Sequence, residues 1–286
     1  MASARKLISG VAYRFIRMTG TERGALRMLM YHRVTDAHPD ERLCVRVDAF
    51  AEHMRRLSAD GWRTVSFADA IEMARGKKPI PEKSLAITFD DGFEDNYTYA
   101  LPSLAQYGFK ACFFVPSAFI ESAGNTEHAP DDRPMTWEQL HELIQQGHEV
   151  GAHSVTHRKL TLMPHAEAEW EIKECKAIIE NRLTLPVRWF CYPAGACNAA
   201  IRKAVARAGY EGACTVRPGA NRPGRDVFAL TRTEISGFDT VEDFSKKLAG
   251  AYDWMHAALQ AFQRLRKPRE CANAMPKKSA KPTAGG

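Results

Sequence analysis

The chain has 286 residues, of which 45% are hydrophobic and 26% are charged. This composition is typical of a globular protein with a sizeable core and argues against a disordered chain. The formal net charge is +6, but residues 1–23 carry +4 and residues 264–286 carry +6, which leaves −4 on the residues between them. A mildly acidic folded part predicts no groove for nucleic acid.

The chain begins with a basic, amphipathic segment, which we expect to cover residues 1–24. Its apolar residues recur at helical spacing among basic ones: Leu7, Val11, Phe15 and Met18. This pattern fits a helix on an anionic membrane surface, and also a helix that docks on its own domain, which is the more frequent arrangement. Arg14 and Arg17 interrupt the apolar stretch, so we expect neither a signal peptide nor a transmembrane helix.

Residues 25–263 are predicted to form one α/β domain, because short apolar runs alternate there with helical patterns. Such alternation indicates βαβ units and a largely parallel sheet. The predicted strands cover residues 26–31, 62–65, 84–89, 111–115, 148–152, 188–191 and 211–216. The predicted helices cover residues 48–59, 66–76, 95–106, 137–146, 165–182, 198–208 and 240–263. Ser66 and the pair Thr136 and Gln139 supply capping signals for two of these helices.

The last segment, residues 264–286, is basic and rich in Pro, Ala and Gly, and is predicted to be disordered. The seven cysteines form no CxxC pair and stand mostly in apolar runs, which indicates small buried thiols and a reducing compartment. With no export signal, these features predict a cytoplasmic protein whose basic termini can contact the inner face of the membrane.

Polar residues gather at the ends of three predicted strands. Asp90 and Asp91 follow the first, His153 and His157 the second, and the run Tyr192-Pro193-Ala194-Gly195 the third. The carboxyl ends of parallel strands form the usual active-site edge of an α/β sheet. Because neighbouring side chains diverge as they leave a strand, one aspartate can bind a metal while the other handles a proton.

The spacing of His153 and His157 allows two imidazoles to converge on one ion if the segment coils after its strand. Two histidines and one carboxylate leave coordination positions open, and such a site lowers the pKa of bound water from 15.7 to about 7. Hydrolysis of an amide or ester is the natural use. Taken alone, each motif has a commoner interpretation, a solvated helix for HxxxH and an ordinary turn for Asp-Asp-Gly.

Two motifs about sixty residues apart, Thr88-Phe89-Asp90-Asp91-Gly92 and His153-Ser154-Val155-Thr156-His157, resemble the first two motifs of the NodB-like polysaccharide deacetylases, carbohydrate esterase family 4. The resemblance spans residues 26–236 and includes the segments 92–97, 111–115, 135–137 and 147–151. It implies a distorted (β/α)7 barrel. It also implies Asp90 as the general base toward metal-bound water, with the metal held by Asp91, His153 and His157.

The metal implied by the resemblance is zinc, with cobalt or nickel as alternatives, and the implied substrate is an N-acetylated sugar of a polysaccharide or lipid-linked glycan. The run Phe190 to Gly195 resembles the third family motif, in which the backbone N–H of Ala194 would help bind the oxyanion. Tyr192 and Pro193 would contact the substrate, although core packing explains Tyr192 and Trp189 as well. Many family members carry an arginine where this chain has Cys191; Arg222 and Arg232 are candidates to replace it.

The usual C-terminal histidine motif is missing, since His256 is the only histidine after Gly195. The first predicted strand instead ends at His32. This arrangement resembles the circularly permuted deacetylases, in which the acid histidine comes from an N-terminal strand, and it implies His32 as the general acid; a purely structural histidine is the alternative. An O-acetyl esterase, another amidase, or a carbohydrate-binding protein without turnover, suggested by Cys191, are the competing functions.

Overall fold

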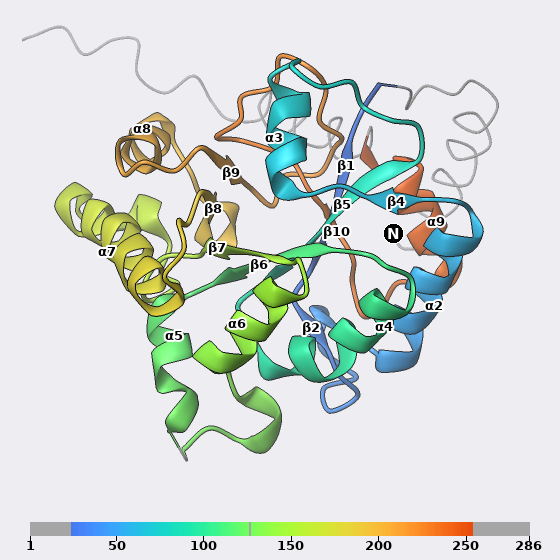
Figure 1. The fold of residues 1–286 in the computed structure, drawn as a ribbon, viewed down its shortest axis with the longest axis horizontal. Helices are drawn as coiled ribbons and strands as arrows, with labels where there is room; N and C mark the ends of the chain where they lie inside the picture. The colour runs from blue at the N-terminus through green and yellow to red at the C-terminus, as the bar shows by residue number, and fades with distance from the viewer. Residues whose placement is uncertain (1–23, 126, 254–286) are drawn as a thin grey trace, which may run out of the picture. The chain divides into compact units, whose positions relative to one another are not determined.

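The computed structural model describes residues 24–125 and 127–253, and these form an α/β domain around a curved sheet of parallel strands (Figure 1). Seven strands follow one another in the order β10-β1-β5-β6-β7-β8-β9, and the short strand β4 pairs with β5 beside them. All the strand pairings are parallel. The sheet curls into a half-barrel, which confirms the predicted α/β barrel fold.

The strands of this sheet are short and mostly buried. They are β1 (Arg27–Tyr31), β4 (Arg63–Thr64), β5 (Ser84–Asp90), β6 (Ala111–Val115), β7 (Glu149–Ala152), β8 (Trp189–Cys191), β9 (Gly212–Cys214) and β10 (Thr233–Glu234). A separate two-stranded sheet pairs β2 (Arg33–Val34) with β3 (Cys44–Val45) directly after β1. The central strands β5 and β6 are largely apolar runs, as is usual where both faces of a parallel sheet are covered.

Helices connect the strands. They are α2 (Val47–Ala59), α3 (Phe67–Ala74), α4 (Leu101–Gln106), α5 (Ser117–Glu121), α6 (Trp137–Gln145), α7 (His165–Leu183), α8 (Ala199–Arg207) and α9 (Val241–Leu248). A π-helical turn, Asn96–Ala100, leads into α4. Ser66 caps α3 and Thr136 forms a capping box with Gln139 at α6, as the sequence predicts.

The two faces of the sheet pack into two separate apolar clusters. Leu85, Ile87 and Phe89 of β5 belong to the larger one, which includes residues of α2, α4, α6, α7 and α8. Side chains alternate along a strand, so Ala86 belongs to the other cluster, inside the curve of the sheet. That inner cluster is filled by Met28, Phe114 and Cys191 among others and includes α3 residues. Thr88 and Asp90 lie on this same inner face.

Most predicted elements are confirmed within a residue or two, and the differences have simple causes. Strands β2, β3 and β10 were not predicted, because they have two residues each and therefore too little periodicity to recognise. The one-turn helix α5 was not predicted either. The predicted helix 240–263 is interrupted, because α9 ends at Leu248 and Gly250 then has a φ of 75°. The amphipathic N-terminal segment, the tail and residues 254–263, with His256, lie outside the described residues.

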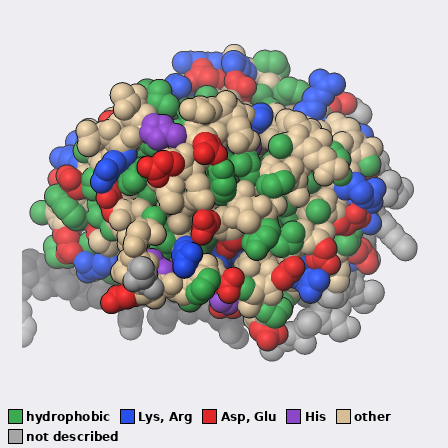
Figure 2. All heavy atoms as spheres, turned by 60° about the horizontal axis from the view of Figure 1, so that its bottom comes forward, with side chains coloured by type: hydrophobic (Ala, Val, Ile, Leu, Met, Phe, Trp, Pro, Cys, Tyr) green, Lys and Arg blue, Asp and Glu red, His purple; other side chains and the backbone are tan. Residues whose placement is uncertain are grey.

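On the face of the molecule that Figure 2 shows, basic, acidic and hydrophobic side chains of the described residues are interspersed. Within the described ranges, no helix has the length and apolar character needed to cross a membrane.

Candidate active site

Strand β5 delivers the two aspartates in different directions. Asp90 ends the strand and is 1% exposed, buried on the inner face of the sheet. Asp91 and Gly92 both have a positive φ, 75° and 74°, so the chain turns sharply as it leaves the strand. Glycine tolerates this geometry, and an aspartate adopts it at a modest cost. The turn separates the two carboxylates, as expected for two different tasks.

The two motif histidines come from the loop that follows β7. His153 is 2% exposed, and its Nδ1 lies 2.7 Å from the carbonyl oxygen of Cys191. This contact leaves Nε2 facing the site. Ser154 and His157 have positive φ values of 65° and 59°, so the loop coils tightly and brings the His157 Nε2 within 3.2 Å of the His153 Nε2.

Three potential metal-binding atoms, one each from Asp91, His153 and His157, lie close together. The Asp91 Oδ1 lies 3.5 Å from the His153 Nε2 and 3.1 Å from the His157 Nε2. Atoms that bind one tetrahedral zinc ion at 2.0–2.1 Å are about 3.3 Å apart, so these spacings fit a single ion. Asp91 Oδ1 is buried and has no hydrogen-bond donor within the described residues. The donor set therefore fits a divalent transition metal ion.

A second group, Asp90, His153 and Cys191, also has its atoms close together. Asp90 is already bound by a guanidinium, as described next, and that guanidinium also lies 3.0 Å from Cys191 Sγ, so a metal cation at this group would meet a positive charge already in place. His153 also faces the first group through Nε2. Asp91, His153 and His157 are therefore the better metal-binding set.

Arg232 binds Asp90 through both arms of its guanidinium. Nη1 donates to Asp90 Oδ1 and Nη2 to Asp90 Oδ2, each at 2.7 Å, and the arginine side chain is fully buried. Burial would raise the pKa of the Asp90 carboxyl, but the charge and hydrogen bonds of Arg232 outweigh it and the pKa is lowered. Nη2 also lies 3.0 Å from Cys191 Sγ, so this guanidinium reaches the point at which an arginine on β8 would otherwise lie.

Of the two arginines considered as replacements, Arg232 is thus the one at the site, whereas Arg222 is exposed. Arg232 lies immediately before β10 and bridges β9 and β10: its N–H donates to Arg217 O and its Nε to Thr215 O, at 2.9 and 3.0 Å. The sequence offered little to distinguish the two, because the contact with Asp90 joins positions 142 residues apart.

His32 follows β1 and lies beside Asp90, with its Nε2 4.0 Å from Asp90 Oδ2 and a side chain 12% exposed. Its pKa is lowered, mainly by burial, although the charges of Asp90 and Asp91 oppose this. The backbone around His32 is held from the loop after β5. Asn96 Nδ2 donates to the His32 carbonyl at 2.9 Å, and Asp95 accepts from the N–H of Val34 at 3.0 Å.

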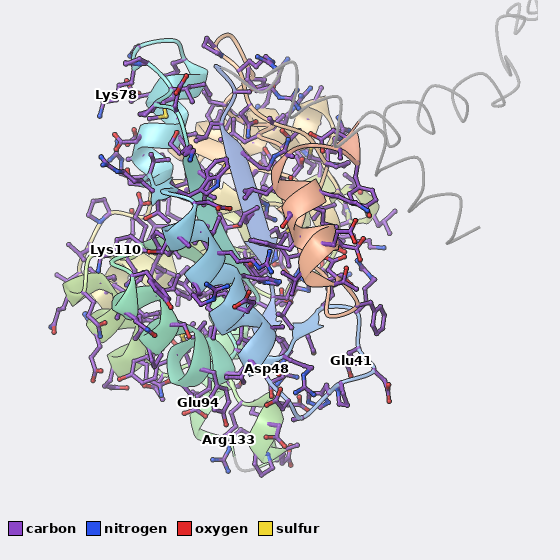
Figure 3. All side chains as sticks on the ribbon, turned by 90° about the vertical axis from the view of Figure 1, so that its right-hand side faces the viewer. Glu41, Asp48, Lys78, Glu94, Lys110 and Arg133 are labelled. Atoms are coloured by element: carbon purple, nitrogen blue, oxygen red, sulfur yellow. The ribbon has the colours of Figure 1, made fainter. Side chains whose placement is uncertain are left out.

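An ion-pair network, buried at Arg33 and Asp95 and half-exposed at Asp132, extends this support outward. Arg33 contacts Asp95 at 2.7 Å and Asp132 at 2.6 Å, and thereby joins the segment after β1 to the loop before α6. Figure 3 shows Glu94, from the loop after β5, and Arg133, from the loop before α6, near each other at the lower end of the domain, where the N–H of Glu94 donates to Arg133 O at 2.9 Å. The sequence analysis did not identify this network.

The third motif is divided between the site and the core. Ala194 is exposed and has φ 52° within the turn Pro193–Gly195. The prediction that Tyr192 and Pro193 contact substrate is not supported, because both are buried. The Tyr192 hydroxyl donates to Phe228 O at 3.0 Å and its ring packs edge-on against Phe190, so no ring face is left for a sugar. Trp189 likewise lies in the inner cluster.

Comparisons with known proteins agree with this site. Residues 77–213 match the family model described as Polysaccharide deacetylase. Polysaccharide deacetylase YxkH of Bacillus subtilis is 32% identical over 217 residues, which cover 76% of this chain and 74% of that protein. The poly-beta-1,6-N-acetyl-D-glucosamine N-deacetylase of Escherichia coli K12 is 30% identical over 122 residues, 40% of this chain but only 18% of that protein.

Among solved structures, the Streptococcus pyogenes deacetylase PplD in complex with acetate is similar in fold. Its TM-score is 0.70 at 22% identity, over 78% of this chain and 97% of that one. The shared half-barrel, the matched residues and the identity to the Bacillus protein lead to one conclusion. This chain belongs to the polysaccharide deacetylase family of carbohydrate esterases, a family of hydrolases.

Proposed function

We propose that this chain is a metal-dependent N-deacetylase that hydrolyses the acetamido group of N-acetylated sugars in a polysaccharide or lipid-linked glycan. One observation carries the proposal. A buried carboxylate, Asp90, and a buried imidazole, His32, lie 4.0 Å apart directly beside the Asp91, His153 and His157 cluster. A hydrolase that breaks an amide needs a base, an acid and an electrophile in this proximity.

Asp91, His153 and His157 would hold the metal ion. When bound, a divalent ion of this kind polarises an acyl oxygen and lowers the pKa of water. The protein fixes the three ligands differently: His153 through the Cys191 carbonyl, and Asp91 and His157 through turns of left-handed backbone. The charge of one carboxylate leaves the occupied site net positive, which favours the developing oxyanion.

Asp90 would act as the general base. Arg232 keeps its carboxyl ionised by lowering its pKa, and the bidentate contact fixes the orientation of the carboxylate. Asp90 takes a proton from the attacking water, whose oxygen forms the new bond to the acetyl carbon. The N–H of Ala194, on the exposed turn after β8, would donate to the oxyanion.

His32 would act as the general acid. The bond between the acetyl carbon and the sugar nitrogen breaks as His32 donates its proton to that nitrogen, which leaves acetate and a free amino sugar. Burial lowers the pKa of His32 and so makes it a stronger proton donor, while Asp90 close by favours the protonated ring. General acid catalysis of this kind contributes about 10²- to 10⁴-fold.

The position of His32 on the first strand supports the likeness to deacetylases whose acid histidine precedes the other motifs. The Escherichia coli relative is named for an N-deacetylase of poly-β-1,6-N-acetylglucosamine, which supports N-acetylglucosamine polymers as the first substrates to try. Acetyl esters are the second candidate class, because the same base, metal ligands and acid would serve them.

The proposal is tested by acetate release from N-acetylglucosamine oligomers, measured with zinc-reconstituted protein. We expect release by the wild type, and none by Asp90→Asn or after removal of the metal with a chelator. A His32→Gln variant should lose activity more steeply on amides than on acetyl esters, because an amine leaves less readily without a proton. If the zinc-bound wild type releases no acetate from oligomers of any length but cleaves acetyl esters, the N-deacetylase assignment is wrong.

A further inference from the structure

Glu171 of α7 is a buried carboxylate that binds the loop between the two metal-binding histidines. It is 1% exposed. Its Oε2 accepts the N–H of Val155 at 2.8 Å and the N–H of Thr156 at 2.9 Å, and its Oε1 accepts the Thr156 hydroxyl. All three hydrogen bonds therefore end on the two residues at the middle of the His153–His157 loop.

The loop needs such support because its conformation is unfavourable. Ser154 and His157 are not glycines, yet both have the left-handed backbone that is strained for an L residue. Glu171 holds the N–H groups between them, and the first residues of α5 hold the opposite side: Ser117 N donates to Ser154 O at 3.2 Å and Ala118 N to Val155 O at 3.0 Å.

The two histidines depend on this loop to different degrees. The His153 ring is buried and is held through Nδ1 by the Cys191 carbonyl. The side chain of His157 is 44% exposed, and within the described part of the chain its ring makes polar contacts through Nε2 to Asp91 and His153. The position of the His157 ring is thus set mainly by the backbone of the loop that Glu171 binds.

We propose that Glu171 is a positioning residue of the metal centre, which fixes the His153–His157 loop so that His157 Nε2 meets the ligand atoms of Asp91 and His153. This inference rests on the proposed metal-dependent function. It assigns Glu171 no contact with metal or substrate: the carboxylate acts through the backbone of Val155 and Thr156. Outer partners of this kind contribute about 10- to 100-fold to metal affinity.

The chain contains a matched control for this proposal. Glu149, at the start of β7, is also a mostly buried carboxylate that accepts two backbone N–H groups and one side-chain donor: Phe67 N, Ala68 N at 3.2 Å and Trp189 Nε1 at 3.0 Å. It lies at the other end of the strand that delivers His153. Replacing Glu149 should destabilise the fold in a comparable way without changing the metal site.

The experiment measures Zn²⁺ affinity by competition with a chromophoric chelator. Wild type is compared with Glu171→Met, Glu171→Gln, Glu149→Met and Glu149→Gln. Methionine removes every acceptor, so Glu171→Met should weaken zinc binding about 10- to 100-fold. Glutamine keeps one oxygen for the two N–H groups, so Glu171→Gln should lie between methionine and wild type. Both Glu149 variants should bind zinc as wild type does.

A second readout follows the loop itself. Amide hydrogen exchange of residues 154–157 in the metal-free protein should accelerate in Glu171→Met and remain unchanged in Glu149→Met. If Glu171→Met and Glu149→Met bind zinc equally well, or weaken it equally, the positioning role of Glu171 is wrong while the metal site stands. If the wild type itself binds no zinc, the proposed function fails first.

Discussion

Replacement of Arg232 by methionine tests the pairing that distinguishes this site from relatives with an arginine on β8. The guanidinium and the Asp90 carboxylate share two hydrogen bonds of 2.7 Å and are both buried. Unit charges about 4 Å apart interact by about 4 kcal/mol at an effective dielectric constant of 20. That energy corresponds to about a thousandfold change in an equilibrium, which is the upper limit of the expected effect.

For acetate release by Arg232→Met we expect kcat/KM to fall by at least about tenfold. The fall should not exceed about a thousandfold, the limit set by the charge interaction between Arg232 and Asp90. Without the guanidinium, burial raises the pKa of the Asp90 carboxyl. The base is then protonated at pH values where the wild type is active, so the acidic limb of the pH-rate profile should move to higher pH. Zinc affinity should be unchanged, because Arg232 does not contact Asp91, His153 or His157.

Two further variants make this result specific. A guanidinium returned from β8, in the double variant Cys191→Arg with Arg232→Met, should recover part of the lost activity and move the acidic limb back. The exposed Arg222 supplies the control, and Arg222→Met should behave as wild type. Circular dichroism and zinc stoichiometry show that each variant is folded. If folded Arg232→Met keeps wild-type kcat/KM and an unshifted pH profile, Arg232 does not act through Asp90.

Three other changes have definite expected outcomes. Asn96→Leu removes the hydrogen bond to the carbonyl of the acid histidine, so kcat for acetate release should fall while zinc affinity stays constant. Burial lowers the pKa of His53 from 6.5 to about 4. Between these two pH values only the unfolded chain binds the proton at His53, so the free energy of unfolding should decrease as pH falls from 6.5 to about 4. In urea titrations, His53→Asn should flatten this pH dependence. In Gly151→Ala, the new Cβ would lie 2.5 Å from the Phe114 ring, and urea unfolding should show a loss of about 1–3 kcal/mol, whereas Gly124→Ala, with no neighbouring atom within 4 Å, should be neutral.

The apolar runs of the central strands, with polar residues at their carboxyl ends, predicted a largely parallel α/β sheet, and the barrel followed from the resemblance to the deacetylase family. Asp90, Asp91, His153 and His157 stand at or just after these ends, so parallel pairing brings the three motif segments to one edge, and the left-handed turns at Asp91, Ser154 and His157 complete the site. Arg232 was one of two candidates for the arginine that binds Asp90, because its contact with Asp90 depends on the pairing of the last strand, β10, with the first, β1. Glu171 was not singled out, because in sequence it is one of several glutamates on the helix of residues 165–182.

Tyr192 shows the opposite case, in which the motif was recognised but the burial of the side chain does not support the predicted contact with substrate. An aromatic residue next to the turn after a strand fits a sugar platform and a core residue equally well, and only its burial decides. The two-residue strands β2 and β10 are likewise set by tertiary pairing: Arg33 and Val34 are positioned by the Asp95 carboxylate, not by any local pattern.

The most direct test of the account is a titration of metal-free protein with Co²⁺, in which the visible absorption and the rate of acetate release are followed together. We expect both to saturate at one ion per chain, with no thiolate-to-metal charge-transfer band. His157→Ala should abolish both signals, and Cys191→Ser should keep the absorption spectrum. A charge-transfer band that disappears in Cys191→Ser would place the ion at Asp90, His153 and Cys191 and contradict the proposed roles of Asp90 and Asp91.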